Sequence, residues 1–169
     1  MHVRATRSDD GLALQDVERR AGEGFRTLGL DLIADHEPAS LDELAGYARD
    51  GRAWTAVDDA DHPVGYVLVD EVDGNAHIEQ MSVVPEHHGA GIGRALLDVV
   101  RHWAIATECS CITLTTFADV PWNRPLYEHL GFQVLATDEI GPGLSAVRRL
   151  EAEHGLDPAA RVCMRLDVA

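Results

Sequence analysis

The sequence predicts an α/β domain in which helices cover both faces of one mixed β-sheet. Three observations support this fold class. The composition, 46% hydrophobic and 25% charged, is typical of a folded globular protein. Segments with strand alternation are interspersed with segments of helical periodicity. Clusters of glycine, proline and aspartate separate these segments. At 169 residues the chain has the length of one ordinary domain, so we expect a single domain over residues 1–169.

A strand and a helix are predicted at the start of the chain. Residues 2–6 alternate in the manner of a short strand. Ser8 is placed to cap a helix from about Asp9 to Ala21, because its hydroxyl oxygen can accept a hydrogen bond from a free N–H of the first turn. The glycines that follow predict an irregular segment; they are Gly22, Gly24 and Gly29.

A second helix and three strands come next. Ser40 predicts a helix start, and Glu43 completes a capping box for a helix that ends near Arg49. Three strands are expected between residues 52 and 84. Turn-forming residues separate them at Asp58–His62 and at Asp73–Asn75.

The second half of the chain alternates between helix and strand patterns. Apolar residues recur at helical spacing from Gly91 to about Thr107. The β-branched residues of 111–117 predict a strand, and residues 121–131, from a proline to a glycine, predict a short helix. The last elements are strands at 132–136 and 161–168, and between them residues 138–160 form an insertion with a glycine–proline loop and a helix from Leu144 to about His154.

Cysteine content and hydropathy indicate a cytoplasmic protein. Cys109, Cys111 and Cys163 are odd in number, and their spacing fits neither a disulfide framework nor a zinc site. We expect them to be small apolar residues on strands in a reducing compartment. No apolar stretch is long enough for a membrane span, and the first residues lack the apolar core of a signal peptide.

The charge of the chain excludes some partners. The net charge is −15, and all 14 basic residues are arginines. Such a chain repels nucleic acid and anionic membranes, so we expect neither as a partner. The excess of acid would help to collect a cationic one.

Glycines stand between the third of these strands and the following helix, at Gly89, Gly91 and Gly93 in VVPEHHGAGIGR. Glycine allows close approach of the backbone to a ligand, and the first turn of a helix has free N–H groups at its positive end. The segment therefore predicts an anion site, most naturally for a pyrophosphate. A Walker loop is excluded because the chain has no lysine, and the G-x-G-x-x-G fingerprint fails at Arg94 and Leu96. His87 and His88 are neighbours without further ligands, so we predict no metal site.

Residues 83–94 resemble the coenzyme A motif of the GNAT superfamily of acetyl-CoA-dependent N-acetyltransferases, with His88 where the family usually has Gln or Arg. A second match, Trp122 to Phe132, resembles the family's Asn…Tyr…Gly-Phe segment. The resemblance covers about residues 2–137 and the final strand. It implies a mostly antiparallel sheet of about seven strands with a V-shaped splay between strands four and five.

The resemblance also implies where acetyl-CoA binds. The pantetheine arm would pair with the backbone of Met81, Ser82, Val83 and Val84, with a main-chain N–H near Val83 as the oxyanion donor. The pyrophosphate would lie on the amides of the glycine loop, and Asn123 and Tyr127 would also contact the cofactor. The loop residues implied are His88, Gly89, Ala90, Gly91, Ile92, Gly93 and Arg94.

Acetyl transfer to an amine needs a base, because an alkylamine is mostly protonated at neutral pH, and an acid for the leaving thiolate. The resemblance places bases on the fourth strand, where Glu79 and His77 would share one face. It makes Tyr127 the acid. The alternatives are an exposed polar stripe for Glu79 and His77, and a core tyrosine for Tyr127.

The resemblance places the acceptor pocket between about residues 25–38 and 138–145. The carboxylates there predict a small cationic amine, such as an aminoglycoside or a polyamine, and so an enzyme of the type that inactivates antibiotics. They are Asp31, Asp35, Glu37, Asp138 and Glu139. A protein or peptide acetyltransferase and a non-catalytic acyl-CoA-binding module stay open as alternatives. A homodimer fits the resemblance, although the sequence does not decide the oligomeric state.

Overall fold

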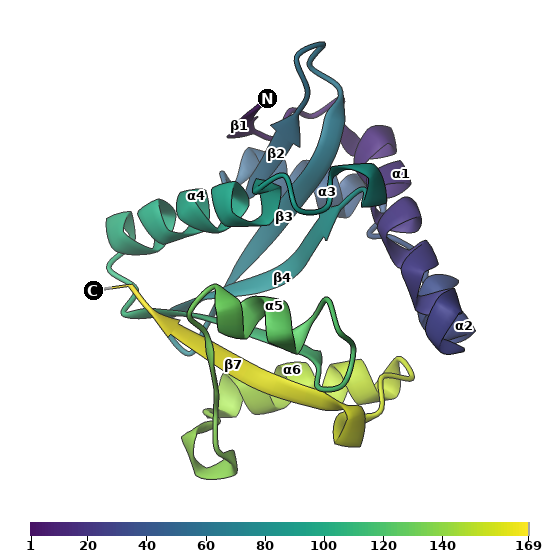
Figure 1. Ribbon diagram of the computed structural model, residues 1–169. Coiled ribbons are helices and arrows are strands. Elements are labelled where there is room, and N and C mark those ends of the chain that lie inside the picture. Colours follow the sequence, from purple (N-terminus) through teal and green to yellow (C-terminus); the bar gives the residue numbers. More distant parts are fainter. Residues whose placement is uncertain (169) are drawn as a thin grey trace. The chain divides into compact units, whose positions relative to one another are not determined.

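The computed structural model describes residues 1–168 and contains a seven-stranded sheet with the strand order β1-β2-β3-β4-β5-β7-β6 (Figure 1). The β4–β5 pair is parallel, and the pairs β1–β2, β2–β3, β5–β7 and β6–β7 are antiparallel. The fold class expected from the sequence is thereby confirmed. The strands are β1 (His2–Ala5), β2 (Ala53–Val57), β3 (Pro63–Val72), β4 (Asn75–Val83), β5 (Cys111–Phe117), β6 (Gln133–Val134) and β7 (Arg161–Asp167).

Six α-helices and four 3₁₀ turns connect these strands among the described residues. The helices are α1 (Gly11–Gly22), α2 (Asp31–Ala34), α3 (Leu41–Arg49), α4 (Ile92–Ala106), α5 (Arg124–His129) and α6 (Pro142–Glu153). The 3₁₀ turns are η1 (Glu23–Leu28), η2 (Pro85–His87), η3 (Thr137–Glu139) and η4 (Pro158–Ala160). No helix within residues 1–168 is long and apolar enough to cross a membrane.

The chain divides into two compact units. Unit 1 comprises Met1–Val69 and Glu79–Val99, and unit 2 comprises Asp70–Ile78 and Val100–Ala169. The predicted V-shaped splay and the predicted single domain both concern how these units are joined, so they stay predictions.

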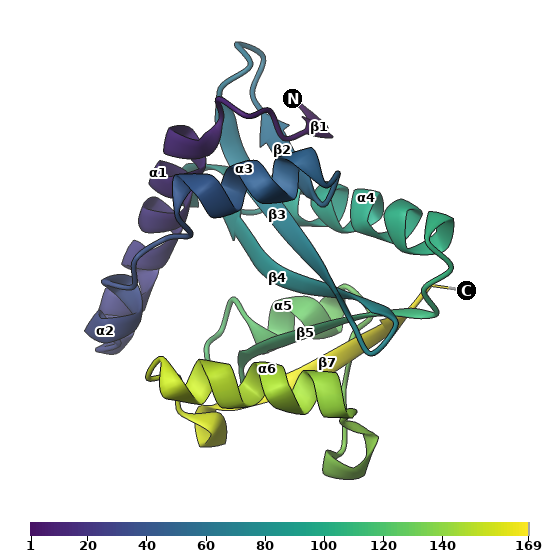
Figure 2. The same cartoon turned by 180° about the vertical axis from the view of Figure 1, so that it is seen from behind.

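In unit 1, helices lie on both faces of the β2–β3 pair: α3 crosses one face, and the first half of α4 the other (Figures 1 and 2). A Cβ added at Gly65 of β3 would lie 3.1 Å from Ile92 of α4 and 3.0 Å from the Ser82 carbonyl oxygen. The glycine therefore allows α4 and β4 to approach β3 closely. On α1, the Glu18 carboxylate accepts a hydrogen bond from the fully buried Tyr66 hydroxyl, which ties this helix to β3.

In unit 2, α5 and α6 cover opposite faces of the β5–β7 pair (Figures 1 and 2). The β5–β7 ladder runs without interruption from Cys111 opposite Asp167 to Phe117 opposite Arg161. The core on this ladder includes the buried Ile112, Leu114 and Met164. The parallel β4–β5 ladder pairs Ala76 to Ile78 with Ile112 to Leu114.

Unit 2 also contains a helix cap that spans 70 residues of sequence. Asp73 and Gly74 form the β3–β4 turn with φ of 52° and 71°, the left-handed values of a two-residue hairpin turn. The Asp73 carboxylate accepts hydrogen bonds from Gly143 N at 2.8 Å and Leu144 N at 3.0 Å, the first turn of α6. A Cβ at Gly141 or Gly143 would lie 2.6–2.7 Å from that carboxylate, so the two glycines make room for it.

Most predicted elements form where the sequence indicates. The capping box of α3 is present: Glu43 N donates to Ser40 Oγ at 3.2 Å, and Ser40 N donates to Glu43 Oε2 at 2.8 Å. The predicted Ser8 cap is wrong. Asp10 is the N-cap residue of α1 and makes no capping bond, because its carboxylate is held by Arg4 at 2.7 Å and by Arg7 N at 2.7 Å. The expected strand at 132–136 is shorter, and the helix around Leu144 begins earlier, at Pro142.

Candidate active site

The loop between β4 and α4 is built as an open backbone surface in unit 1. Gly89 and Gly91 have φ of 79° and 80°, in the left-handed region that favours glycine. A Cβ added at Gly89, Gly91 or Gly93 would meet no heavy atom of the described chain within 4 Å. The three glycines therefore leave the start of α4 uncovered by side chains.

The start of α4 offers N–H groups to a ligand. The backbone bond from Ala95 N to Gly91 O, at 3.0 Å, is the first of this helix, so the N–H groups of Ile92, Gly93 and Arg94 precede the helical ladder. Ala90 differs from the expectation, because its N–H donates to the His87 carbonyl at 3.2 Å. The remaining amides, at the positive end of a 15-residue helix, suit a pyrophosphate.

His88, the departure from the family motif, turns back toward β4. Its Nε2 lies 3.0 Å from the Val83 carbonyl oxygen, so this nitrogen carries the proton and donates. The contact joins the end of β4 to the glycine loop. It also occupies one of the backbone groups with which the pantetheine arm was expected to pair.

The residues of β4 in unit 1 differ in exposure. Glu79 is exposed, Met81 and Val83 are half-buried, and Ser82 is buried. The Ser82 hydroxyl accepts a hydrogen bond from Gln80 Nε2 at 2.8 Å. Glu79 is therefore a carboxylate that water and an acceptor can reach.

His77, on the part of β4 that belongs to unit 2, lies in a different environment. Only 1% of its surface is exposed, and its Nδ1 lies 2.9 Å from Thr113 Oγ1. Burial lowers the pKa of this imidazole, and the carboxylates of Glu151 and Asp70 oppose the shift. His77 is thus a neutral, buried histidine in a hydrogen bond, whereas the prediction treated it as a base beside Glu79.

Asn123 is the N-cap residue of α5, and Tyr127 lies within this helix, in unit 2. The Asn123 side chain and the Tyr127 hydroxyl make no hydrogen bond with the residues that the structure describes. The Tyr127 ring packs edge-on against Phe132 at 5.6 Å between centroids. Desolvation raises the pKa of Tyr127 to about 12, although the positive charge of Arg161 opposes the shift. The hydroxyl is therefore fully protonated at neutral pH and open to a partner.

In unit 1, a hollow of about 200 Å³ lies between the end of α1 and the segment after α2. It contains two of the predicted acceptor carboxylates, Asp35 and Glu37, while Asp31 lies beside it. Arg26 binds Asp35 at 2.5 Å and lies 3.7 Å from Asp31. The lining residues are Arg19, Glu23, Arg26, Ala34, Asp35, His36, Glu37 and Pro38.

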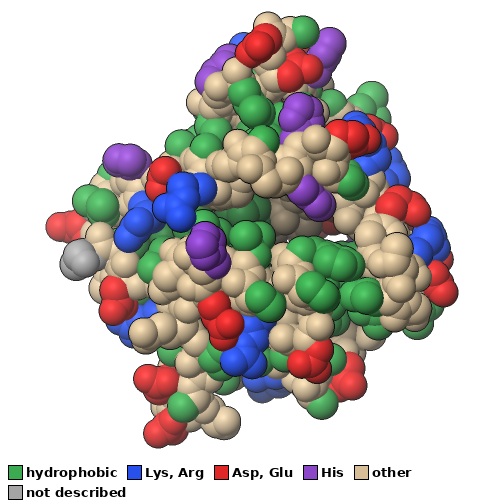
Figure 3. Space-filling model, viewed as in Figure 1, with side chains coloured by type: hydrophobic (Ala, Val, Ile, Leu, Met, Phe, Trp, Pro, Cys, Tyr) green, Lys and Arg blue, Asp and Glu red, His purple; other side chains and the backbone are tan. Residues whose placement is uncertain are grey.

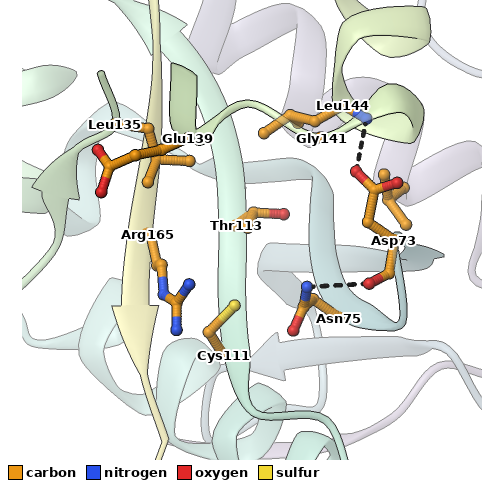
Figure 4. Close-up of a pocket in the computed structure, with 10 residues that line it drawn as sticks. Asp73, Asn75, Cys111, Thr113, Leu135, Glu139, Gly141, Leu144 and Arg165 are labelled. Atoms are coloured by element: carbon orange, nitrogen blue, oxygen red, sulfur yellow. Dashed lines mark hydrogen bonds between the residues drawn. The ribbon is translucent and has the colours of Figure 1, made fainter. Parts of the chain in front are cut away.

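The other predicted acceptor carboxylates lie in unit 2, where Glu139 lines a second hollow of about 120 Å³ (Figure 4). Arg165 and Cys111 face it from the sheet, and Asp73 lies on the opposite side. This hollow is lined by Gly141 and Leu144 at the start of α6, whereas Tyr127 belongs to α5, which lies on the opposite face of the β5–β7 pair (Figures 1 and 2). Within unit 2, Glu139 and Tyr127 are therefore not brought together. Asp138, which precedes Glu139 in the sequence, is exposed.

The ion pairs that arginines make near the hollow in unit 1 were not expected from the sequence. Arg26 neutralises part of the acidic segment, and Arg20 of α1 pairs with Glu86 of η2 at 2.8 Å. On the face shown in Figure 3, acidic and basic side chains are interspersed. The charge count of the chain does not indicate these pairs, because the contacts of Arg26 depend on the helical turns of residues 23–34 and the contact of Arg20 on the position of α1 beside η2. Among residues 1–168, no group of three or more His, Cys, Asp or Glu side chains could hold a metal ion.

Comparison with known proteins adds independent information. The sequence profile of the Acetyltransferase (GNAT) family matches residues 17–132. The chain is 27% identical over 141 residues to the peptidyl-lysine N-acetyltransferase YjaB of Salmonella typhimurium, covering 83% of this chain and 88% of that protein.

Two solved structures are similar in fold. A GNAT-family acetyltransferase from Staphylococcus aureus has a TM-score of 0.73 at 13% identity, with 99% of each chain covered. Rv2747 from Mycobacterium tuberculosis, solved in complex with CoA and NLQ, has a TM-score of 0.70 at 17% identity, also with 99% of each chain covered.

Proposed function

The chain belongs to the GNAT family of acetyltransferases, and from this premise we propose which of its residues act and which amine it acetylates. It is an N-acetyltransferase, and acetyl-CoA is its cosubstrate. The observation that supports acetyl-CoA binding most directly is the open glycine loop with its free amides at the start of α4. We assign the pyrophosphate to the N–H groups of Gly89 and Gly91 to Arg94.

We assign the proton transfers to Glu79 and Tyr127. Acetyl-CoA supplies a thioester, and the attacking amine must lose a proton. Glu79 is exposed and can take that proton directly or through water. Tyr127, with its pKa near 12, keeps its proton at neutral pH, so its first contribution is a hydrogen bond to the leaving sulfur. His77 is not included as a base, because it is buried and hydrogen-bonded to Thr113.

The acceptor in this proposal is a primary alkylamine that is cationic at neutral pH. The hollow beside α1 contains three carboxylates against two arginines, which favours a cation. Its volume of about 200 Å³ is below the roughly 300–1,000 Å³ of pockets for drug-sized ligands. It therefore suits the alkylammonium arm of a polyamine better than a whole aminoglycoside. Asp138 and Glu139 are left out of this proposal, since Glu139 lines the hollow beside α6, on the other face of the β5–β7 pair from α5 and Tyr127.

A second candidate acceptor is the side-chain amine of a lysine in a peptide. The name of the Salmonella relative, peptidyl-lysine N-acetyltransferase, favours it. A lysine side chain is also an alkylammonium arm, so the same charges and the same hollow would serve it.

The three buried free cysteines support a reducing compartment, and we place the protein in the cytoplasm.

The test is release of free CoA from acetyl-CoA, measured with a thiol reagent. The panel contains polyamines, lysine peptides, peptides with only an N-terminal amine, amino acids and aminoglycosides. We expect turnover with polyamines or lysine peptides, and a large loss of kcat in Glu79→Gln. Turnover confined to aminoglycosides or to α-amines would contradict the acceptor proposed here. A Glu79→Gln enzyme with normal kcat would contradict the assignment of the base.

A further inference from the structure

The hollow beside α1 contains one arginine that the protein itself does not neutralise. Arg26 is surrounded by three carboxylates, with Glu23 at 3.0 Å, Asp35 at 2.5 Å and Asp31 at 3.7 Å. These three carboxylates neutralise the charge of Arg26 within the protein. The hollow's other arginine, Arg19, is exposed and makes no hydrogen bond or ion pair with residues 1–168.

The two residues next to Arg19 on α1 have their hydrogen bonds and ion pairs with other partners. The Glu18 carboxyl feels the charge of Arg19, but its hydrogen bond comes from the buried Tyr66 hydroxyl. Arg20 is paired with Glu86 at 2.8 Å and lies 3.6 Å from Asp16. Arg19 thus keeps a guanidinium with five donors available to a ligand.

One carboxylate of the hollow is equally open. Glu37 is exposed and has no hydrogen bond or ion pair within the described chain, whereas Asp35 is held by Arg26. The hollow therefore presents an open cation, Arg19, and an open anion, Glu37. A ligand that satisfies both carries a positive and a negative group.

The hollow and the turn η2 before the glycine loop both involve residues of the second half of α1. Arg19 lines the hollow, and the next residue, Arg20, contacts Glu86 in the turn that leads into that loop. The hollow and the turn that leads into the predicted cofactor site are therefore both in contact with α1 in unit 1. Groups next to the reacting amine, and not the amine alone, would contact these charges.

We propose that Arg19 recognises an acidic side chain next to the acceptor lysine, so that the protein prefers lysines in peptides with a neighbouring Glu or Asp. This inference rests on the lysine-peptide form of the proposed function. Glu37 pairs with the lysine or with a neighbouring cation of the same peptide. Because the pairing is exposed, its contribution is modest and is screened by salt.

The experiment compares KM for peptides that differ only beside the lysine, with Glu, Gln or Arg at one and two positions on either side. The wild type, Arg19→Gln and Arg19→Glu are measured with each peptide. Arg149→Glu is the matched control, because Arg149 is exposed on α6 and its substitution changes the net charge equally. Acetyl-CoA binding of every variant is measured by calorimetry.

For the wild type we expect a KM about two- to fivefold lower with the Glu-flanked than with the Gln-flanked peptide, the range of an exposed ion pair. The preference should disappear in Arg19→Gln, turn toward Arg-flanked peptides in Arg19→Glu, persist in Arg149→Glu, and weaken between roughly 0.02 and 0.5 M salt.

Two results overturn the proposal in distinguishable ways. If lysine peptides are acetylated but the preference is absent, or Arg19→Glu behaves as Arg149→Glu does, the charge recognition is wrong and the acetyltransferase assignment stands. If acetyl-CoA binds but no lysine peptide is acetylated, the lysine acceptor is wrong, and this inference fails with it.

Discussion

The cap that Asp73 supplies to α6 should be measurable as folding stability. Its carboxylate accepts two hydrogen bonds from the first turn of α6, at 2.8 Å and 3.0 Å. Loss of a helix cap costs about 0.5–2 kcal/mol, and loss of a negative charge at a helix N-terminus costs about 0.3–1 kcal/mol. Asp73 is exposed, so we expect its cap to contribute about 1–2 kcal/mol in total.

A second effect at Asp73 acts in the opposite direction for one substitution. Its φ of 52° is left-handed, which costs a residue with a Cβ about 1–2 kcal/mol, less for Asp and Asn. Asp73→Gly relieves this cost and loses the cap, whereas Asp73→Ala loses the cap and keeps the strain. We expect stability to fall in the order Asp73→Asn, Asp73→Gly, Asp73→Ala, with losses of about 0.5, 1 and 2–3 kcal/mol.

Urea unfolding measures these losses, and Glu108→Gly is the matched control. Glu108 has φ of 60°, and no side-chain hydrogen bond of it is present in the described chain. Its replacement by glycine should stabilise the protein by up to about 1 kcal/mol. If Asp73→Gly stabilised the protein as much as Glu108→Gly does, the cap on α6 would contribute nothing, and the reasoning would be refuted.

Four further predictions concern the site and its surroundings. Tyr127→Phe should lower kcat about 10²-fold or more with unchanged acetyl-CoA affinity in calorimetry, and the wild-type rate should show no loss between pH 8 and 10 from this residue, whose pKa is about 12. Gly91→Ala, at φ 80°, should weaken acetyl-CoA binding about tenfold, measured by the same titration. His88→Ala should weaken it less, because the 3.0 Å contact with the Val83 carbonyl only supports the loop. Burial lowers the pKa of His77 in the folded state, so the unfolded chain binds more protons at this residue. The contribution of His77 to the free energy of unfolding should therefore be fully present above pH 6.5 and decline below it. Urea unfolding at several pH values should show a smaller decline of stability with falling pH in His77→Gln than in the wild type.

Local signals account for the parts of the fold that the sequence predicted well. The capping box at Ser40 and Glu43 and the aspartate–glycine turn at Asp73 each depend on bonds within a few residues of chain. Ser8 failed as a cap because Asp10, two residues on, has a partner 6 residues back in Arg4. The short helices η1 and α2 were missed for two reasons: the glycines around them are typical of a loop, and helices of this length are too short to show an apolar periodicity.

The candidate site was predictable where its chemistry is in the backbone. Gly89 and Gly91 have the left-handed φ that the spacing of the glycines suggested. Side-chain roles were less accessible, because they depend on burial. His77 and Glu79 are two residues apart on β4, yet one is buried in a hydrogen bond and the other is exposed. No periodicity in the sequence distinguishes a solvent-facing histidine from a buried one that is hydrogen-bonded to Thr113.

The net charge of −15 is a poor guide to which carboxylates can bind an acceptor. Asp10, Asp35 and Asp61 each have arginine partners, and these partners lower the pKa of all three, although burial opposes the shift at Asp10 and is its largest single influence. Such carboxylates stay ionised, but their fields are largely cancelled at the distance of a ligand. Glu37 has no such partner within residues 1–168, so a cation meets its full negative charge. Replacement of Glu37 by Gln should therefore raise the acceptor KM more than replacement of Asp35 by Asn, although both remove one negative charge from the same hollow. Equal effects of the two substitutions would mean that the total charge of the hollow, and not the unpaired carboxylate, selects the acceptor.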